Sequence, residues 1–238
     1  MLELDRLLQE QTRYYEDRAP EYEDVWFRRG PYDLGPQGNA RWFEETARLE
    51  AAADAFGATG EVLELACGTG LFTRRLVRSA TRLTAIDVSA RVLEINRRRV
   101  GDPSVTYVHG DLFAWEPPDG RRFDAIFSSF LISHIPPSRF EEFWGRLERW
   151  LAPGGRAFVC DDLEGGESRP SNPGRSVDEG PRFLHRRKLR TGREYTIVKV
   201  FYRPERLAAM LHPLGWGSEV GTTGDEFFHM TAWPERTR

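Results

Sequence analysis

Short apolar runs alternate with amphipathic, helix-length segments through the middle of the chain. Apolar residues at helical spacing indicate helices, whereas continuous apolar runs of about four to eight residues indicate buried strands. Strands that alternate with helices form a parallel sheet covered on both faces, so the sequence predicts an α/β fold. The core strands are expected at 61–66, 82–86, 105–108, 123–128 and 156–161, and the core helices at 71–79, 89–100 and 138–151.

Less regular segments flank this alternating core, which occupies residues 58–162. Residues 1–57 are expected to form a helical cover over the sheet, and residues 163–192, rich in Gly, Pro, Ser and Arg, are expected to form a long loop. A chain of 238 residues fits one α/β domain, since such domains commonly run to ~200–250 residues. Within the flanks we expect helices at 2–22 and 41–56, and a strand–helix–strand in 193–238 at 194–202, 204–215 and 226–233.

The composition disfavours several classes of function. A formal net charge of −3 gives no general electrostatic reason to bind nucleic acid, because that binding depends on clustered Lys and Arg. No apolar run approaches the ~18–20 residues of a membrane span, and the N-terminal residues are acidic and amphipathic, so we expect a cytoplasmic protein without a membrane partner. Cys67 and Cys160 lie beside predicted core strands without a neighbouring His, which predicts buried thiols and no metal site.

The predicted strand at 61–66 breaks abruptly into glycines, reading Val-Leu-Glu-Leu-Ala-Cys-Gly-Thr-Gly over residues 62–70. Glycine lets a backbone turn tightly and approach a ligand where a Cβ would collide. Seventeen residues after Gly70, the next apolar run ends in Asp87, whose carboxylate can accept hydrogen bonds from both hydroxyls of a ribose. This order of strand, glycine turn and acid indicates a nucleotide pocket.

Two cofactor classes use this layout. A dinucleotide fingerprint is Gly-x-Gly-x-x-Gly/Ala, and Thr73 occupies its last position here, which disfavours NAD. By contrast, Glu64-x-Ala66-x-Gly68-x-Gly70 resembles the first motif of class I S-adenosylmethionine-dependent methyltransferases, with Ala66 in place of the usual leading glycine. Three further segments follow in the order that this family shows: Gly110-Asp111-Leu112, Phe123-Asp124-Ala125-Ile126 and Leu151-x-Pro153-Gly154-Gly155.

The resemblance covers roughly residues 60–160 and implies S-adenosylmethionine as the cofactor. It also implies a Rossmann-like, doubly wound sheet of seven strands, mostly parallel with the last strand antiparallel, to which the strands at 194–202 and 226–233 would add the final pair. In such sheets the ligand lies at the carboxyl ends of the strands. The implied cofactor contacts are Glu64, Ala66, Cys67, Gly68 and Gly70 for the methionine part, Asp87 for the ribose, Val88 and Leu112 for the adenine faces, Asp111 for the adenine amine, Ser128 at the end of the fourth strand, and Tyr15 or Tyr22 for the cofactor carboxylate.

The end of the fourth predicted strand narrows the class of substrate. Ser128 and Ser129 stand where methyltransferases of nucleobase amines or glutamine amides carry Asn/Asp-Pro-Pro, which disfavours those substrates. The following Ser-His-Ile-Pro resembles bacterial small-molecule methyltransferases. His134 is therefore the candidate general base, because its ordinary pKa lies near neutrality, although the ring could equally fix the loop.

The N-terminal cover and the long loop supply the candidate substrate contacts. Aromatic rings can stack on a flat substrate, and Arg can pair with a carboxylate or phosphate, although an aromatic cluster also fits a protein core. The candidates are Tyr14, Trp26, Arg28, Arg29 and His185.

We therefore expect an S-adenosylmethionine-dependent methyltransferase that transfers a methyl group to an O, N or C nucleophile of a small molecule by in-line displacement. The alternatives are an NAD-dependent oxidoreductase, a protein methyltransferase and a cofactor-binding protein without catalysis. The sequence leaves open which molecule is methylated and whether the protein is a homodimer.

Overall fold

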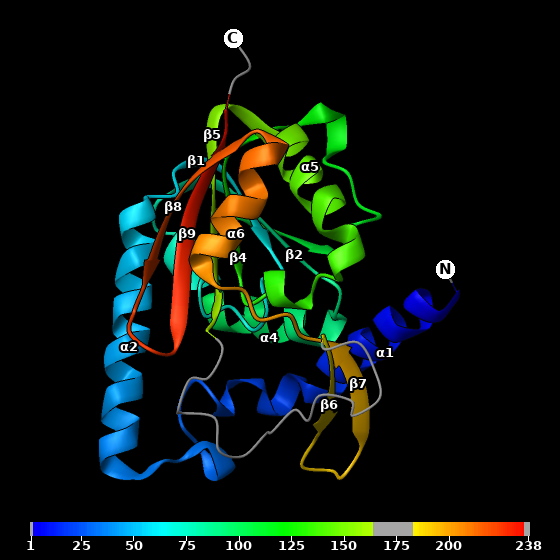
Figure 1. Ribbon diagram of the computed structural model, residues 1–238, viewed down its shortest axis with the longest axis vertical. Coiled ribbons are helices and arrows are strands. Elements are labelled where there is room, and N and C mark those ends of the chain that lie inside the picture. Colours follow the sequence, from blue (N-terminus) through cyan, green and yellow to red (C-terminus); the bar gives the residue numbers. More distant parts are fainter. Residues whose placement is uncertain (1, 164–182, 236–238) are drawn as a thin grey trace.

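The alternating segments fold into a seven-stranded sheet with the order β3-β2-β1-β4-β5-β9-β8 (Figure 1). The computed structural model describes residues 2–163 and 183–235. Strands β1 to β5 pair in parallel, and β9 runs antiparallel to both of its neighbours, which confirms the predicted fold class. The strands of this sheet are β1 (Gly60–Leu65), β2 (Ala80–Asp87), β3 (Val105–His109), β4 (Phe123–Ser129), β5 (Leu151–Asp162), β8 (Trp216–Thr222) and β9 (Phe227–Pro234).

The C-terminal part of the sheet differs from the sequence prediction. The segment expected at 194–202 forms β7 (Glu194–Val198), which pairs with β6 (Leu184–Lys188) in a separate two-stranded sheet. The seventh strand of the main sheet is instead β8, whose two glycines and several exposed residues give only a weak apolar pattern. Strand β6 lies inside the segment expected to be a loop, the middle of which, 164–182, is outside the described residues.

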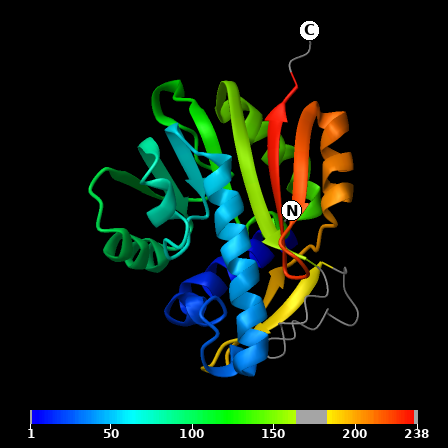
Figure 2. The same cartoon turned by 90° about the vertical axis from the view of Figure 1, so that its left-hand side faces the viewer.

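Helices cover both faces of the sheet, as the alternation predicts (Figure 2). One face packs against α5 and α6, where Phe143 and Trp144 are fully buried, and the other packs against α2, α3 and α4. Full burial of such a side chain stabilises the fold by roughly 1.5–3 kcal/mol. These helices are α2 (Gly35–Phe56), α3 (Thr73–Leu76), α4 (Ala90–Val100), α5 (Phe140–Trp150) and α6 (Pro204–Leu211). Helix α3 is shorter than the expected 71–79. No helix in the described ranges has the length and apolarity to cross a membrane.

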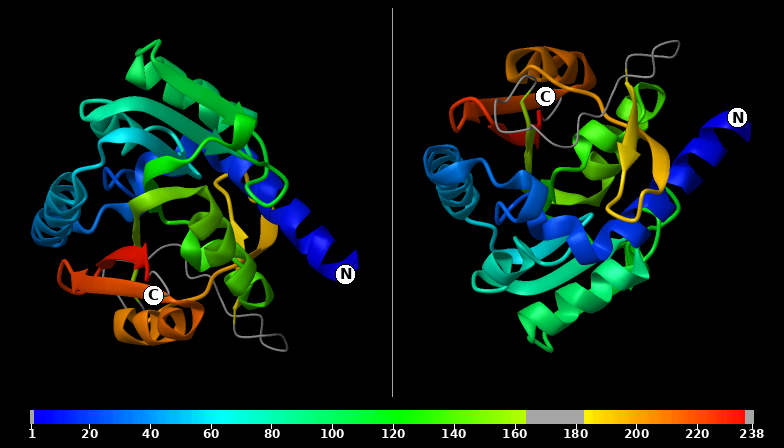
Figure 3. Two further views of the ribbon diagram at one scale, coloured as in Figure 1. Left: turned by 90° about the horizontal axis from the view of Figure 1, so that it is seen from above. Right: turned by 90° about the horizontal axis from the view of Figure 1, so that it is seen from below.

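A cover made of α1 (Leu2–Arg18) and the β6–β7 hairpin lies beneath the carboxyl ends of the central strands (Figures 1 and 3). Helix α1 bonds directly to the hairpin: Glu10 Oε1 accepts the Thr196 N–H at 2.5 Å, and Gln11 Oε1 accepts the Val198 N–H at 2.9 Å. Asp17 accepts the Tyr195 hydroxyl. These side-chain bonds to a strand edge fix the cover as one unit over the end of the sheet where α/β proteins bind ligands.

Candidate functional site

The turn after β1 is built from residues in the left-handed region of backbone conformation. Ala66, Gly68 and Gly70 have φ values of 48°, 54° and 91°. The Cys67 N–H donates to the Ile86 carbonyl at 3.1 Å, which ties the turn to the end of β2. Left-handed backbone is costly for residues with a Cβ, so Ala66 is a strained position that the surrounding turn holds in place.

Asn96 fixes this turn from α4, and the sequence analysis did not single it out. Its Nδ2 donates to the carbonyls of Cys67 at 3.2 Å and Gly68 at 3.0 Å and to Thr73 Oγ1 at 2.8 Å, and its Oδ1 accepts the Tyr107 hydroxyl at 2.9 Å. The side chain is fully buried. Its signal in the sequence is a polar residue within the apolar stripe of an amphipathic helix.

Alanine at Gly70 should destabilise the protein through Asn96. An added Cβ would lie 2.7 Å from Asn96 Oδ1, and Asn96 cannot move without breaking its bonds to the turn. Gly154 is the matched control, because its φ of 84° carries the same backbone strain but nothing lies within 4 Å of its Cβ position. We expect Gly70→Ala to lower the unfolding free energy in urea by about 1–3 kcal/mol more than Gly154→Ala does. Equal losses would contradict the contact.

Asp87 ends β2 with its carboxylate held by backbone donors. Oδ2 accepts the Gly68 N–H at 3.0 Å and Oδ1 accepts the Ser89 N–H at 2.9 Å. Burial raises the pKa of Asp87, and these backbone bonds lower it, which offsets part of that rise. Each oxygen keeps a further lone pair, so the position is set for additional hydrogen bonds from a ligand.

Glu64 lies on β1 with its side chain 1% exposed, and neither carboxylate oxygen has a hydrogen-bond partner among the described residues. Burial raises the pKa of Glu64 to about 8; the nearby Thr73 hydroxyl lowers it, and the charge of Asp87 raises it further. A buried carboxyl without partners is rare in proteins. A cationic group of a ligand would supply the missing partner, and the ammonium of S-adenosylmethionine is such a group. The residues at this turn therefore fit that cofactor.

Two cavities open at this end of the sheet and share one wall. The Asp87 cavity is lined by Asp87, Val88, Asp111 and Leu112, and the Lys199 cavity lies under the cover; with their open mouths included, the two measure about 990 Å³ and 1160 Å³. The wall that both share is formed by Tyr15, Tyr22, Ala66, Gly68, Ser129, Phe130 and His134.

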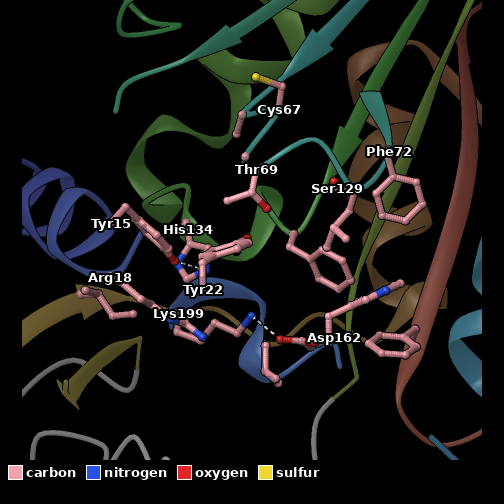
Figure 4. Close-up of a pocket in the computed structure, with 18 of the residues that line it drawn as sticks. Tyr15, Arg18, Tyr22, Cys67, Thr69, Phe72, Ser129, His134, Asp162 and Lys199 are labelled. Atoms are coloured by element: carbon pink, nitrogen blue, oxygen red, sulfur yellow. Dashed lines mark hydrogen bonds and ion pairs between the residues drawn. The ribbon is translucent and has the colours of Figure 1, made fainter. Parts of the chain in front are cut away.

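His134 and Tyr15 form a hydrogen-bonded pair in the shared wall (Figure 4). His134 Nδ1 lies 2.6 Å from the Val198 carbonyl, which can only accept, so Nδ1 carries the proton. Nε2 is then the acceptor for the Tyr15 hydroxyl at 2.7 Å. Burial and the charge of Lys199 hold the pKa of His134 well below its usual range, while burial raises the pKa of Tyr15 well above its own. The pair is therefore neutral at physiological pH.

The Lys199 cavity combines aromatic and charged walls. The Lys199 side chain is 4% exposed, and its Nζ lies 2.8 Å from Asp162 Oδ2 (Figure 4). The same Nζ lies 3.1 Å from Asp161 Oδ1 and 2.8 Å from Ser133 Oγ. Arg18 of α1 and Arg187 of β6 also line it. The aromatic part of its wall is made by Trp26, Tyr32, Trp42, Phe72 and Phe227.

The structure places the residues expected from the sequence in three groups. One or both cavities are lined by Tyr15, Tyr22, Trp26, Ala66, Cys67, Gly68, Asp87, Val88, Asp111, Leu112 and His134. Glu64, on β1, and Gly70, in the turn, belong to the elements that form the site but line neither cavity. Asp111 also caps its own turn through the Phe113 N–H at 2.8 Å. The remaining candidates lie outside both linings: Tyr14, Arg28, Arg29, Ser128 and His185. Tyr14 is buried against Tyr195, and His185 packs beside Phe201. Arg28 stacks on Trp42 and Arg29 on Phe27, while Ser128 points to the opposite side of β4 from Ser129.

Arg18 and Lys199 of the Lys199 cavity were not among the expected contacts, whereas Arg187 lies in the segment around His185 from which substrate contacts were expected. Arg18 ends an amphipathic helix, where a surface position is the ordinary expectation, and Lys199 stands within an apolar run. Arg187 belongs to the basic run that follows His185. The two residues are two positions apart on β6, so their side chains face the same side of the strand. A Lys flanked by Val198 and Val200 was the available signal.

Comparison with known proteins gives similarities at two levels. A family model described as "Methyltransferase domain" matches residues 62–155. The demethylmenaquinone methyltransferase of Clavibacter sepedonicus is 38% identical over 101 residues, which are 42% of this chain and 40% of that protein. The phosphoethanolamine N-methyltransferase 1 of Triticum aestivum is 31% identical over 118 residues, which are 47% of this chain and 24% of that protein. The chain thus spans less than half the length of these curated relatives.

A similarity over the full length comes from a solved structure. The DhpI–SAH complex is 33% identical, with 98% of each chain covered and a TM-score of 0.75. The DhpI–SAM–HEP complex gives 35% identity, 96% coverage of this chain, 98% of the other and the same TM-score. This likeness includes the cover and the C-terminal strands, which the family model does not reach.

Proposed function

Because the chain belongs to the class I S-adenosylmethionine-dependent methyltransferases, we propose that it transfers a methyl group from S-adenosylmethionine to a nucleophilic atom of a small molecule. We further propose that it works as a single domain in the cytoplasm, without nucleic acid or a membrane. The observation that carries this proposal is the pair of cavities that share one wall. One cavity has the carboxylates of a nucleoside site, and the other offers room for an acceptor.

The closed cover favours a small acceptor. The Lys199 cavity lies between the strand ends and the cover of α1 with β6–β7, so an acceptor would be enclosed on both sides. The DhpI–SAM–HEP complex holds a third component beside its cofactor, and the names of both curated relatives specify small molecules. These likenesses support a small molecule over a protein substrate.

The chain's own residues do two things in this proposal. Glu64, the turn at residues 66–70 and Asp87 bind the cofactor, which supplies a methyl group already activated on a sulfonium. The cover excludes water and aligns the acceptor, and alignment of reacting groups can supply as much as ~7–11 kcal/mol. Tyr15 and His134 stand where the two cavities meet, so they set the position of the acceptor atom or receive its proton.

Thermal unfolding with added ligands tests the proposal first. A ligand at ~100 times its Kd stabilises a protein by ~2.7 kcal/mol, which for a domain of this size raises Tm by roughly 5–10 °C. We expect that rise with S-adenosylmethionine and S-adenosylhomocysteine and none with NAD. A rise with NAD alone would instead favour an oxidoreductase, and cofactor binding without methylated product in a broad acceptor screen would favour a non-catalytic binding protein.

A further inference from the structure

Gln11 of α1 joins the edge of β7 to the short 3-10 helix η4 (Ile132–His134). Its Oε1 accepts the Val198 N–H at 2.9 Å, and its Nε2 donates to the His134 carbonyl at 3.2 Å. The Val198 carbonyl in turn accepts His134 Nδ1–H at 2.6 Å. These three hydrogen bonds close a ring through Gln11, Val198 and His134. Gln11 also lines the Asp87 cavity, so the ring stands directly beside the site.

Each hydrogen bond of this ring has one possible direction. A backbone N–H only donates and a carbonyl only accepts, so the Gln11 amide fits one way round and His134 Nδ1 carries a proton. Burial and the charge of Lys199 depress the pKa of His134 and keep its ring neutral. Nε2 is then unprotonated, so the Tyr15 hydroxyl donates its proton to Nε2 at 2.7 Å. The Tyr15 oxygen therefore offers only lone pairs to a ligand where the two cavities meet.

Two further contacts near His134 do not decide which ring nitrogen carries the proton. The Val200 N–H donates to the Ser133 carbonyl at 2.7 Å, which fixes the backbone of η4 but does not involve the ring. The Tyr15 hydroxyl can donate to Nε2 or accept from it, so it is compatible with either tautomer. The tautomer therefore depends on the Val198 carbonyl, and the Gln11 amide ties that residue to His134 itself.

We propose that Gln11 is a positioning residue of the site: it holds the edge of β7 against His134 and so keeps His134 in the Nδ1–H tautomer, with Tyr15 as the donor to Nε2. The use of this pair in methyl transfer rests on the proposed function, whereas the tautomer itself does not. Helix α1 thus does more than cover the cavities, because it sets which nitrogen in their shared wall is free to accept a proton. A polar group that is fixed before the ligands arrive needs no reorganisation when they bind.

The tautomer of His134 can be measured without knowing the acceptor. Two-bond ¹H–¹⁵N correlation spectra of protein labelled with ¹⁵N-histidine distinguish protonated from unprotonated ring nitrogens. They are recorded at about pH 8, above the ordinary His pKa of about 6.5. The chain has five histidines, and the signals that disappear in His134→Asn belong to His134. We expect a protonated Nδ1 and an unprotonated Nε2 in the wild type. A ring protonated at Nε2, or at both nitrogens, would overturn the proposal.

Two variants of α1 test the role of Gln11. Gln11→Met keeps the length of the side chain but loses both hydrogen bonds, so we expect the ratio of Nδ1–H to Nε2–H to fall roughly 5- to 10-fold, the factor that one hydrogen bond represents. Glu10→Met is the matched control, because Glu10 docks the same helix on the same strand through the Thr196 N–H at 2.5 Å without touching His134. Its tautomer ratio should equal that of the wild type. An unchanged ratio in Gln11→Met, or an equal fall in Glu10→Met, would overturn the proposal.

Tyr15→Phe separates the role of Gln11 from a role of the Tyr15 hydroxyl. We expect Nδ1 to stay protonated in this variant, because the bond to the Val198 carbonyl remains; a shift of the proton to Nε2 would assign the tautomer to Tyr15 and refute the inference. Titration of the wild type with S-adenosylhomocysteine keeps the two proposals apart. Failure to bind it would remove the methyltransferase function but not the tautomer result, whereas normal binding with an unchanged ratio in Gln11→Met would remove this inference alone.

Discussion

Replacement of Asp87 by alanine is expected to weaken S-adenosylhomocysteine binding by roughly 10²–10⁴-fold. The wild-type carboxylate is fixed by the Gly68 and Ser89 N–H groups and keeps lone pairs for two ribose hydroxyls. Hydrogen bonds to a charged acceptor contribute about 1.5–3 kcal/mol each, so two of them account for about 3–6 kcal/mol. The substitution also frees the Gly68 N–H and loosens the turn that the methionine part would contact. Isothermal titration calorimetry measures the affinity directly.

Two further variants show whether the loss is local. Asp124 also accepts a backbone N–H, from Glu61 at 2.9 Å, but it lies at the amino end of β4, away from both cavities. Asp124→Ala should therefore leave the affinity unchanged. Asp87→Asn preserves the size of the side chain and should still lose most of the affinity, because its amide nitrogen faces a backbone donor in place of an acceptor oxygen. An Asp87→Ala protein that is folded and binds normally would show that the ribose lies elsewhere.

The sheet and the cofactor turn could be predicted because they follow local rules. Strands β1 and β2 contain short, mostly apolar runs, and the glycines and Asp87 follow closely at their ends. Strand β8 was missed because it is an edge strand with two glycines and exposed residues, so its pairing with β9 depends on tertiary context. Short-range patterns carry no information about such pairing.

The acceptor side of the site was harder to predict for a different reason. Arg18, Arg187 and Lys199 are far apart in the sequence and meet only because α1 docks on the β6–β7 hairpin through Glu10 and Gln11. Of the residues expected near the N-terminus, Trp26 lines the cavity, whereas Tyr14, Arg28 and Arg29 belong to the right segment but lie outside both linings. Tyr14 turns into the packing beneath the hairpin, whereas its neighbour Tyr15 faces the cavities, and no spacing rule separates two adjacent residues of one helix when both sides of that helix are covered.

Replacement of Glu64 by glutamine is expected to stabilise the free protein at neutral and alkaline pH and to weaken cofactor binding. Glu64 has a pKa of about 8 in the folded protein against 4.5 without the fold, so the native state binds more protons than the unfolded state between these values. Stability from this group is therefore fully present below about pH 4.5 and falls as pH rises toward 8. Between the two pKa values, each pH unit lowers the unfolding free energy by about 1.36 kcal/mol, so the stability lost between pH 4.5 and pH 7 is roughly 3 kcal/mol.

The glutamine side chain in Glu64→Gln has nearly the same shape as the protonated Glu64 and does not titrate. We therefore expect the unfolding free energies of wild type and Glu64→Gln, measured in urea, to agree near pH 5 and to diverge by roughly 3 kcal/mol at pH 7, with the variant the more stable. Parallel pH profiles of the two proteins would mean that Glu64 is ionised in the free protein and has found a partner.

The same carboxyl should release a proton when the cofactor binds. At pH 7 most free protein carries protonated Glu64, and a cationic ammonium beside it favours the ionised form, so binding of S-adenosylhomocysteine releases close to one proton. Calorimetric titrations in phosphate and in Tris, which differ in ionisation enthalpy, measure that number. Glu64→Gln should release almost none and bind more weakly, because a buried ammonium then faces a neutral amide. Normal affinity in the variant, with unchanged proton release, would place the ammonium away from Glu64 and assign the titrating group to another residue.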